Sequence, residues 1–192
     1  MKKYLPTAGG FTLVELMVTV AIATILMLVA VPSLTTYRRN ADLTSTTNTL
    51  VASINAARGE ALKRGVSAMV VPTNNGSDWT TGWVVFVDLD SSRTYVAAND
   101  PIVFTQAALP SYLQVKGSSV AGSATPAIIF DASGYSKTRT GGFGAFTISI
   151  FRNDAATDFS QRRIVIVANT GRVRVCTPTS ATDPFCKVGL TE

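Results

Sequence analysis

Basic side chains are concentrated late in the sequence, between residues 137 and 174. This stretch has two acidic residues, Asp154 and Asp158, and seven basic ones: Lys137, Arg139, Arg152, Arg162, Arg163, Arg172 and Arg174. A local net charge of +5 on an otherwise mildly acidic body favours an anionic partner. The alternative is an ordinary solvated face and, for Arg172 and Arg174, pairing with Asp154, Asp158 or Asp183.

Contact with DNA is one chemistry that this stretch suits. Arg172 and Arg174 alternate along an expected strand, so both are expected on one face of it. Gly171 before them permits a tight turn and a close backbone approach by a partner. Paired arginines suit phosphate groups and give sequence-independent binding to double-stranded DNA that weakens with salt. The predicted DNA-binding residues are Gly171, Arg172, Arg174, Arg162, Arg163, Lys137 and Arg139, whereas Lys116 is expected to lie outside this surface.

Cys176 and Cys186 are the two cysteines of the chain. Their spacing is too long for a CxxC redox motif, and the sequence has no histidine to complete a metal site. If this part of the chain lies outside the cytoplasmic membrane, a disulfide that closes a short loop is expected.

Motifs for catalysis are missing from the sequence, which contains no GxSxG and no P-loop. Residues 141–144 (GGFG) lack the βαβ context of a nucleotide fingerprint, so a hairpin tip is expected there. Residues 88–92 (DLDSS) resemble the start of a calcium loop but lack its glycine and distant glutamate, so a turn with Asx hydrogen bonds is expected. The sequence therefore predicts no catalytic residue, no metal and no cofactor.

The N-terminal segment has the composition of a leader followed by a membrane helix. Residues 1–10 (MKKYLPTAGG) are short and basic, and residues 11–31 form an apolar run in which Glu15 carries the only charge. About 20 apolar residues cross a bilayer as a helix. A secretory signal is cut after its apolar run, but the small-residue site here, at Gly10, precedes the run. Cleavage there lowers the net charge from +5 to +3 and leaves the apolar segment on the mature chain.

Glu15 needs a partner inside a membrane. An isolated carboxylate costs about 2.5–3.5 kcal/mol on insertion scales. After cleavage the α-amino group of Phe11, on the same or a neighbouring subunit, is the nearest candidate cation. The alternative is a capping box in which Thr12 and Glu15 start a helix.

One helix is expected from Phe11 to about Arg64, with an amphipathic second half over residues 32–64. Its apolar stripe has helical spacing and consists of Leu43, Leu50, Ile54, Ala57 and Ala61. Lys63 and Arg64 suit a helix C-terminus, and Gly65 suits the cap. Residues 44–49 are polar and poor in helix formers, so any bend or fraying is expected there.

Residues 65–192 have the pattern of a β-sandwich head, which makes the fold class α+β, with the long and partly transmembrane helix packed on antiparallel strands. The expected strands are 66–72, 83–88, 102–105, 112–115, 127–130, 145–151, 163–168 and 172–176. Six aromatic residues are expected in the core: Trp79, Trp83, Phe86, Phe130, Phe146 and Phe151.

Residues 10–16 (GFTLVEL) resemble the prepilin signature of type IV pilins and type II secretion pseudopilins. The resemblance implies that a prepilin peptidase and methyltransferase cuts after Gly10 and methylates Phe11. It also implies that Glu15 matches a neighbouring subunit's N-terminal amine during assembly, and that Pro32 is the proline that kinks the helix.

Four later segments, residues 57–64, 82–88, 130–134 and 171–174, resemble the H-type minor pseudopilins and the related type IV minor pilins. This resemblance implies a minor pilin near the tip of a type IV pilus, which binds DNA through Gly171-Arg172-Val173-Arg174 during natural transformation. An H-type minor pseudopilin of a type II secretion system is the alternative, and an adhesive tip module is a third. The implied partners are other pilins or pseudopilins. The implied location is the bacterial inner membrane with a periplasmic head, and then the filament.

Overall fold

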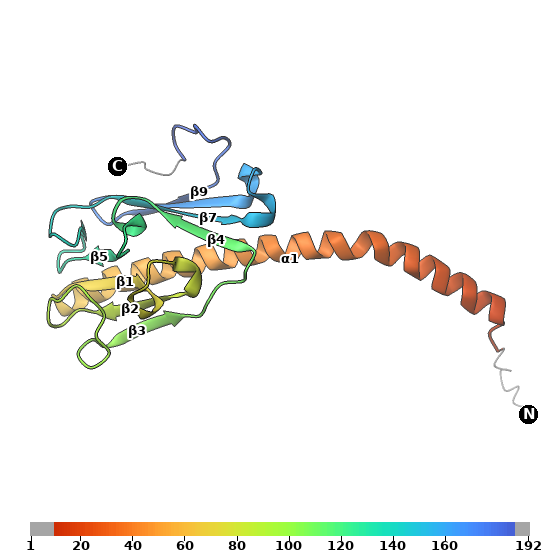
Figure 1. Ribbon diagram of the computed structural model, residues 1–192, viewed down its shortest axis with the longest axis horizontal. Helices are drawn as coiled ribbons and strands as arrows, with labels where there is room; N and C mark the ends of the chain where they lie inside the picture. The colour runs from red at the N-terminus through yellow and green to blue at the C-terminus, as the bar shows by residue number, and fades with distance from the viewer. Residues whose placement is uncertain (1–9, 187–192) are drawn as a thin grey trace, which may run out of the picture. The chain divides into compact units, whose positions relative to one another are not determined.

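The computed structural model describes residues 10–186. One long helix, α1 (Leu13–Arg64), is followed by antiparallel strands (Figure 1). The strands are β1 (Ala68–Pro72), β2 (Trp83–Val87), β3 (Ile102–Gln106), β4 (Leu113–Gly117), β5 (Ile128–Phe130), β6 (Ser136–Lys137), β7 (Phe146–Arg152), β8 (Arg162–Val167) and β9 (Val173–Cys176). The chain divides into two compact units, Met1–Arg38 and Arg39–Glu192.

Local capping chemistry sets both ends of α1. The Thr12 hydroxyl accepts a hydrogen bond from the Glu15 amide at 3.2 Å, which is the N-cap half of the expected capping box. At the other end Gly65 has φ +69°, and its amide donates to the Ala61 carbonyl. Glycine adopts this left-handed conformation without steric cost. The predicted helix end at Arg64 is therefore confirmed.

The polar residues 44–49 do not interrupt the helix. Their hydroxyls donate to carbonyls one turn earlier, Thr44 to Asn40 at 3.1 Å and Thr47 to Leu43 at 2.7 Å. Thr47 is buried, so this bond also satisfies its hydroxyl inside the protein. The structure does not bear out the expectation of a bend or fraying here.

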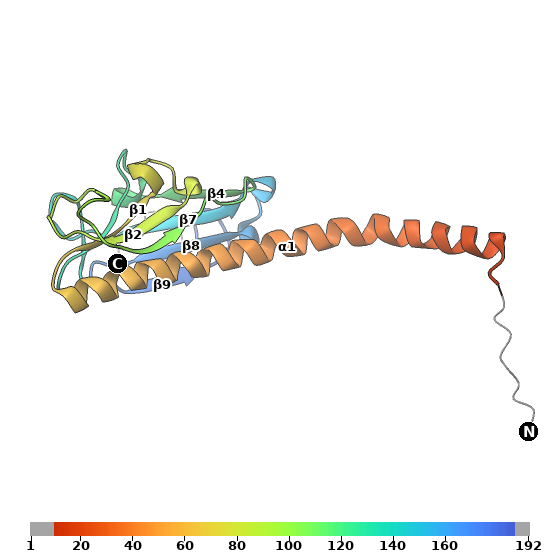
Figure 2. The same cartoon turned by 90° about the horizontal axis from the view of Figure 1, so that it is seen from below.

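The strands form two antiparallel sheets (Figures 1 and 2). Sheet A has the order β3-β2-β1-β5-β6, and sheet B has the order β4-β7-β8-β9. Eight of these strands lie within one or two residues of the predicted ranges, and the ninth, β6, has only two residues and was not predicted. The predicted α+β fold is confirmed.

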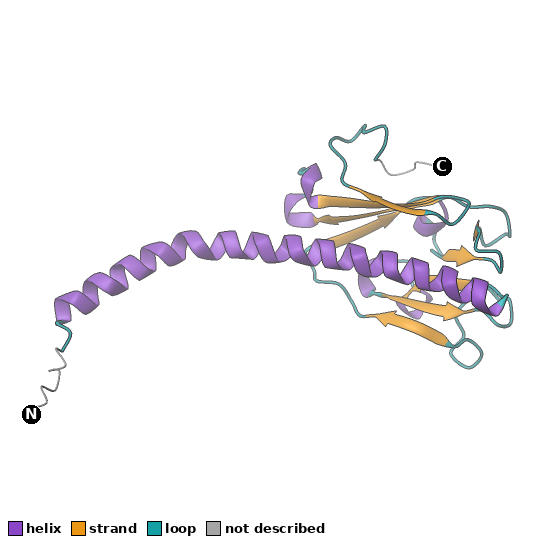
Figure 3. Cartoon of the chain, turned by 180° about the vertical axis from the view of Figure 1, so that it is seen from behind, coloured by secondary structure: helices purple, strands orange, loops and turns teal. Residues whose placement is uncertain are grey.

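The main core lies where the α1 segment from Arg39 onward meets both sheets (Figure 3). The predicted stripe of α1 is buried, with Leu43, Ile54 and Ala57 at 0% exposure. Five of the six expected core aromatics are buried, and the indole nitrogens of Trp79 and Trp83 donate to the Ala121 carbonyl and the Ser53 hydroxyl. Phe151 is the exception, because it lies on the outer face of sheet B.

A second apolar cluster covers the opposite face of sheet A. Met69 and Val71 of β1 lie there with Phe86 of β2, and Tyr95 from the following loop packs on them, its ring 5.2 Å from that of Phe86. Because both faces of β1 and β2 are buried, these strands are apolar throughout and show no alternation.

Candidate functional site

The segment of α1 before Arg39 exposes its apolar side chains. Every side chain described from Phe11 to Arg38 is exposed, including Leu13 (74%) and Leu28 (73%). Within the described residues, α1 is the one helix that is long and apolar enough to cross a membrane. The helix continues through Pro32.

Gly10 and Phe11 come directly before α1, and both are exposed. A side chain built on Gly10 would meet no atom within 4 Å, so the glycine is not required by packing. Among the described residues, no basic group lies within 4 Å of the Glu15 carboxylate. The capping bond uses the amide of Glu15, which leaves its side chain available to a partner.

The structure divides the predicted DNA-binding residues between the two sheets. Lys137 belongs to β6, the edge strand of sheet A, and Arg139 follows it in the next loop. Lys137 pairs with Asp131 at 3.3 Å and lies 3.8 Å over the ring of Phe143. Arg139 donates to the Thr125 carbonyl at 3.0 Å.

Gly171 serves a contact within the chain. It has φ +79°, and a Cβ placed on it would lie 2.2 Å from the Gly134 carbonyl oxygen. Arg58 of α1 holds both loops, donating to Gly134 at 2.9 Å and to Thr170 at 3.1 Å. The close backbone approach that Gly171 permits is therefore made by Gly134 and Arg58 of the same chain.

Arg172 lies just outside the observed strand, although the expected strand, residues 172–176, included it. The strand β9 begins at Val173, and the Arg172 carbonyl accepts from the Ala168 amide in the turn after β8. Arg174 lies on β9 opposite Ile166, and its Nη1 donates to the Phe185 carbonyl at 2.9 Å. Arg174 is thus on β9 as predicted, whereas Arg172 lies one residue before the strand.

The outer face of sheet B carries an aromatic side chain between two cations. Lys116 of β4 lies 5.8 Å over the ring of Phe151 on β7, and Arg162 of β8 lies 4.8 Å over the same ring. Arg162 also lies 5.5 Å over Phe159. Lys116, expected outside the basic surface, thus shares a face with Arg162. The alternation of β4, with Leu113 inward and Lys116 outward, was the signal that could have placed it.

Arg163 points away from this outer face. Its Nη1 donates to the carbonyl oxygens of Ser160 and Arg162, at 2.8 and 2.9 Å. Residues alternate between the faces of a strand, so Arg163 and Arg162 project to opposite sides of β8.

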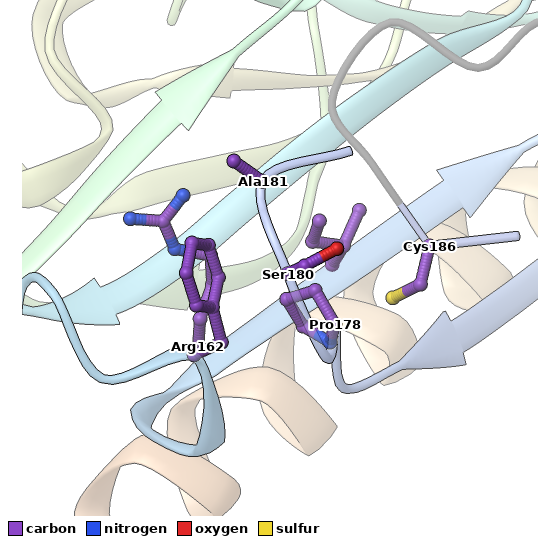
Figure 4. A pocket seen from close by; sticks show the side chains of 7 residues that line it. Arg162, Pro178, Ser180, Ala181 and Cys186 are labelled. Atoms are coloured by element: carbon purple, nitrogen blue, oxygen red, sulfur yellow. The ribbon is translucent and has the colours of Figure 1, made fainter. Parts of the chain in front are cut away.

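A small pocket of about 170 Å³ lies beside Arg162, under the C-terminal loop (Figure 4). Pro178, Ser180 and Ala181 of this loop form one side, and Phe159, Arg162, Ile164 and Cys186 complete the lining. Its mixed apolar and cationic lining extends the outer face of sheet B.

The disulfide between Cys176 and Cys186 closes this loop, with the Cα atoms 5.9 Å apart. The predicted pairing is confirmed. Cys186 packs on Ile164 and Ile166 of β8, so the loop covers apolar surface on sheet B. Inside it Asp183 accepts from the amides of Thr179, Phe185 and Cys186, and these hydrogen bonds lower the pKa of Asp183 to about 2.

A polar network joins α1 to the ends of β4 and β7. The buried Arg152 donates to Asp154 and to Asn40, the latter at 2.6 Å, and Arg39 also pairs with Asp154 at 2.6 Å. Tyr112 donates to the Asp42 carboxylate. Asp154 thus pairs with Arg152 and Arg39, where α1 packs on the head, whereas the pairing considered from the sequence was with Arg172 or Arg174.

Three carboxylates, of Asp88, Asp90 and Asp100, approach one another within 4.8 Å. Main-chain amides of their own loop donate to them, among them Ser92 to Asp90 at 3.0 Å, as expected for an Asx turn. Burial raises the pKa of Asp88, and a hydrogen bond from Asn99 helps lower the pKa of Asp90 to about 2.

This combination of one N-terminal apolar helix with two antiparallel sheets packed on its second half defines a type IV pilin-like protein. The chain belongs to the family described as type II transport protein GspH, whose model matches residues 46–180. The model of the prokaryotic N-terminal methylation motif matches residues 6–31. A search of curated protein sequences found no significant relative.

Two solved structures share the fold. The type IV minor pilin FimU of Pseudomonas aeruginosa is 19% identical with a TM-score of 0.56, and the match covers 75% of this chain and 98% of FimU. The minor pseudopilin EpsH of the Vibrio cholerae type II secretion system is 16% identical with a TM-score of 0.52, covering 72% of this chain and 98% of EpsH. At these identities the matches establish the fold.

Proposed function

We propose that this chain is a minor pilin-like subunit of a type IV pilus, cut after Gly10, methylated at Phe11 and incorporated near the filament tip. The observation that carries the proposal is the apolar segment that starts directly after Gly10. All of its described side chains are exposed, and it contains one charge, Glu15. Such a surface requires an apolar environment. The inner membrane supplies it before assembly, and the helices of other subunits supply it afterwards.

Glu15 supports the same proposal. A carboxylate at this depth is costly unless it is paired, and no described cation lies near it. The methylated amine of Phe11 on a neighbouring subunit fits this requirement, because a charge on one chain then recognises a charge on the next.

The head of this chain has an exposed surface that suits contact with a neighbouring subunit. Strand β3 is the edge of sheet A, and its Ile102, Val103 and Phe104 are exposed. A groove of about 280 Å³ is lined by Val103 and Phe104 of this strand and by small residues of α1, including Ala52 and Ala56. An exposed apolar edge strand is a site for pairing with another chain. We expect another pilin-like head to cover it.

The β3 contact can be tested with a matched pair of variants. Phe104 and Val96 are equally exposed, at 38%. Phe104→Asp should lower the yield of this subunit in sheared filaments, and Val96→Asp should not. Equal incorporation of both variants would remove β3 from the interface.

The H-type pseudopilin of a type II secretion system is the second assembly that the proposal admits. It predicts the same processing but different partners. The kind of filament that contains the subunit, a surface pilus or a secretion pseudopilus, distinguishes the two.

Contact with double-stranded DNA is a second candidate function. The specific observation in its favour is the outer face of sheet B, where Lys116 and Arg162 flank Phe151. This surface differs from the one expected from the sequence, because it includes Lys116 and is centred on Phe151.

Processing tests the main proposal. Intact-mass analysis of the chain from its host should give a mature protein that starts at methylated Phe11. Gly10→Val should block cleavage, because a branched side chain would occupy the cut site, and the uncut chain should stay in the cytoplasmic membrane. Recovery of assembled chains that still carry residues 1–10 would disprove the proposal.

A further inference from the structure

Arg93 and Arg139 form a pair of cations with no acidic partner. They come from two separate loops, and each donates from Nη1 to the main-chain carbonyl oxygen of the other. In the described part of the chain, no carboxylate lies within the 4 Å of an ion pair from either guanidinium. Burial lowers the pKa of Arg139, as expected where water is removed from a cation and no anion replaces it.

The two arginines line one pocket of about 380 Å³ whose other lining residues are neutral and polar: Asn75, Ser92, Thr94 and Thr125. Arg139 uses its Nε on the Thr125 carbonyl at 3.0 Å. Nη2 of both arginines and Nε of Arg93 have no hydrogen-bond acceptor among the described residues. The pocket thus offers unused N–H donors and two uncompensated positive charges.

We propose that this pocket binds a phosphate group, either free or as the monoester of a small molecule. A planar carboxylate satisfies one guanidinium by a two-pronged contact. A tetrahedral phosphate has oxygens on several sides, so it can accept from two guanidinium groups at once and from nearby hydroxyls. Its double negative charge also matches the two cations.

The nearby carboxylates of Asp88, Asp90 and Asp100 do not act as the anionic partner of these arginines. The Asp88 carboxylate accepts hydrogen bonds from the amides of Ser92 and Arg93. The Asp100 carboxylate accepts them from the amides of Leu89 and Val96. These carboxylates are therefore engaged with the main chain, and the Arg93 guanidinium is directed to the pocket that Arg139 shares.

The test titrates the full mature chain, in neutral detergent at constant ionic strength, with inorganic phosphate. Calorimetry should show saturable binding, and the amide NMR signals of residues 92–94 and 125 should shift. Arg93→Gln and Arg139→Gln should each weaken binding by about tenfold or more, because a charge-assisted hydrogen bond is lost. Lys63→Gln, which removes an exposed charge paired with Glu60 at the end of α1, should leave the affinity unchanged.

Parallel titrations identify the ligand. Binding of glycerol 3-phosphate with at least equal affinity indicates a phosphomonoester, and binding of inorganic phosphate alone indicates the free ion. Acetate that competes as well as phosphate would overturn the assignment. A calorimetric titration of the wild-type chain that shows no saturation would also overturn it. This result does not depend on whether any variant folds.

Discussion

The guanidinium of Arg152 forms a bidentate ion pair with the carboxylate of Asp154, with Nε 3.0 Å from Oδ1 and Nη2 2.6 Å from Oδ2. Arg152 is buried, and Asp154 is its only ion-pair partner in the described residues. The hydrogen bond from Arg152, aided by that from Arg39, holds the pKa of Asp154 well below its usual range. The pair therefore couples the stability of the head to pH.

Asp154→Asn should destabilise the protein at pH 7 by about 3 kcal/mol, because it leaves a buried guanidinium without its counter-ion. The pKa of Asp154 is lower in the folded chain than the value of about 3.9 expected after unfolding. Its contribution is thus complete above about pH 5 and is lost as the pH falls further. Urea unfolding should show the difference between wild type and variant shrinking from pH 7 to pH 3. A constant difference would contradict this account.

Gly171→Ala should destabilise the head by about 3 kcal/mol, because it combines a strained positive φ with a steric clash. The new Cβ would lie 2.2 Å from the Gly134 carbonyl oxygen and 2.7 Å from Arg58 Nε. Gly142→Ala is the matched control, since its Cβ would meet only the Thr138 hydroxyl, at 3.5 Å. Thermal unfolding of both variants measures the contrast. Similar melting temperatures would show that the turn relaxes without cost.

Sequence reasoning succeeded where the determinants were local. The end of α1 followed from Gly65 and the buried stripe from helical spacing. It failed where distant segments meet. Lys137 lies on β6 of sheet A and Arg139 follows it, whereas Arg162 lies on β8 of sheet B. Arg58, which fixes the turn at Gly171, comes from a helix far earlier in the chain, and no local pattern identifies it.

Replacing both Cys176 and Cys186 by serine should cost about 2–3 kcal/mol, because the unfolded chain regains the freedom of a short loop. The loop should loosen before the sheets do. Hydrogen exchange should therefore accelerate at Thr179 and Cys186, whose amides bond to Asp183, and stay slow in β7. Reduction of the unaltered protein is the control and should give the same pattern. Free thiols in protein isolated from the cell envelope would exclude a structural role for this bridge.

Glu15→Ala should preserve membrane insertion, since it removes a carboxylate that costs about 2.5–3.5 kcal/mol in the bilayer. Assembly should fall, because the N-terminal amine of the neighbouring subunit loses its partner. The measurement is the amount of this subunit in membranes and in sheared filaments. Thr12→Ala is the control that separates helix capping from charge matching, because it removes the cap and keeps the Glu15 carboxylate. Wild-type incorporation of the Glu15 variant would refute charge matching.

The last prediction concerns DNA and the outer face of sheet B. Lys116 is exposed, and both it and Arg162 lie over Phe151, so their charges are available on one surface. The full mature chain in neutral detergent should shift double-stranded DNA in a gel at low salt, without sequence preference. A dissociation constant of about 10⁻⁴–10⁻⁶ M is typical of such contacts. Avidity along a filament would raise the apparent affinity.

Two double variants decide which residues form the contact. Lys116→Gln with Arg162→Gln should weaken binding and lower the salt slope by about two, as expected when two phosphate contacts are lost. Lys137→Gln with Arg139→Gln removes the same charge at the β6 edge of sheet A. It should change binding much less, because Lys137 pairs with Asp131 and Arg139 lines a separate pocket. Equal losses from both pairs would mean that only net charge matters. No shift from the wild-type chain would remove DNA as a partner and favour the secretion pseudopilus, whose partners are other subunits.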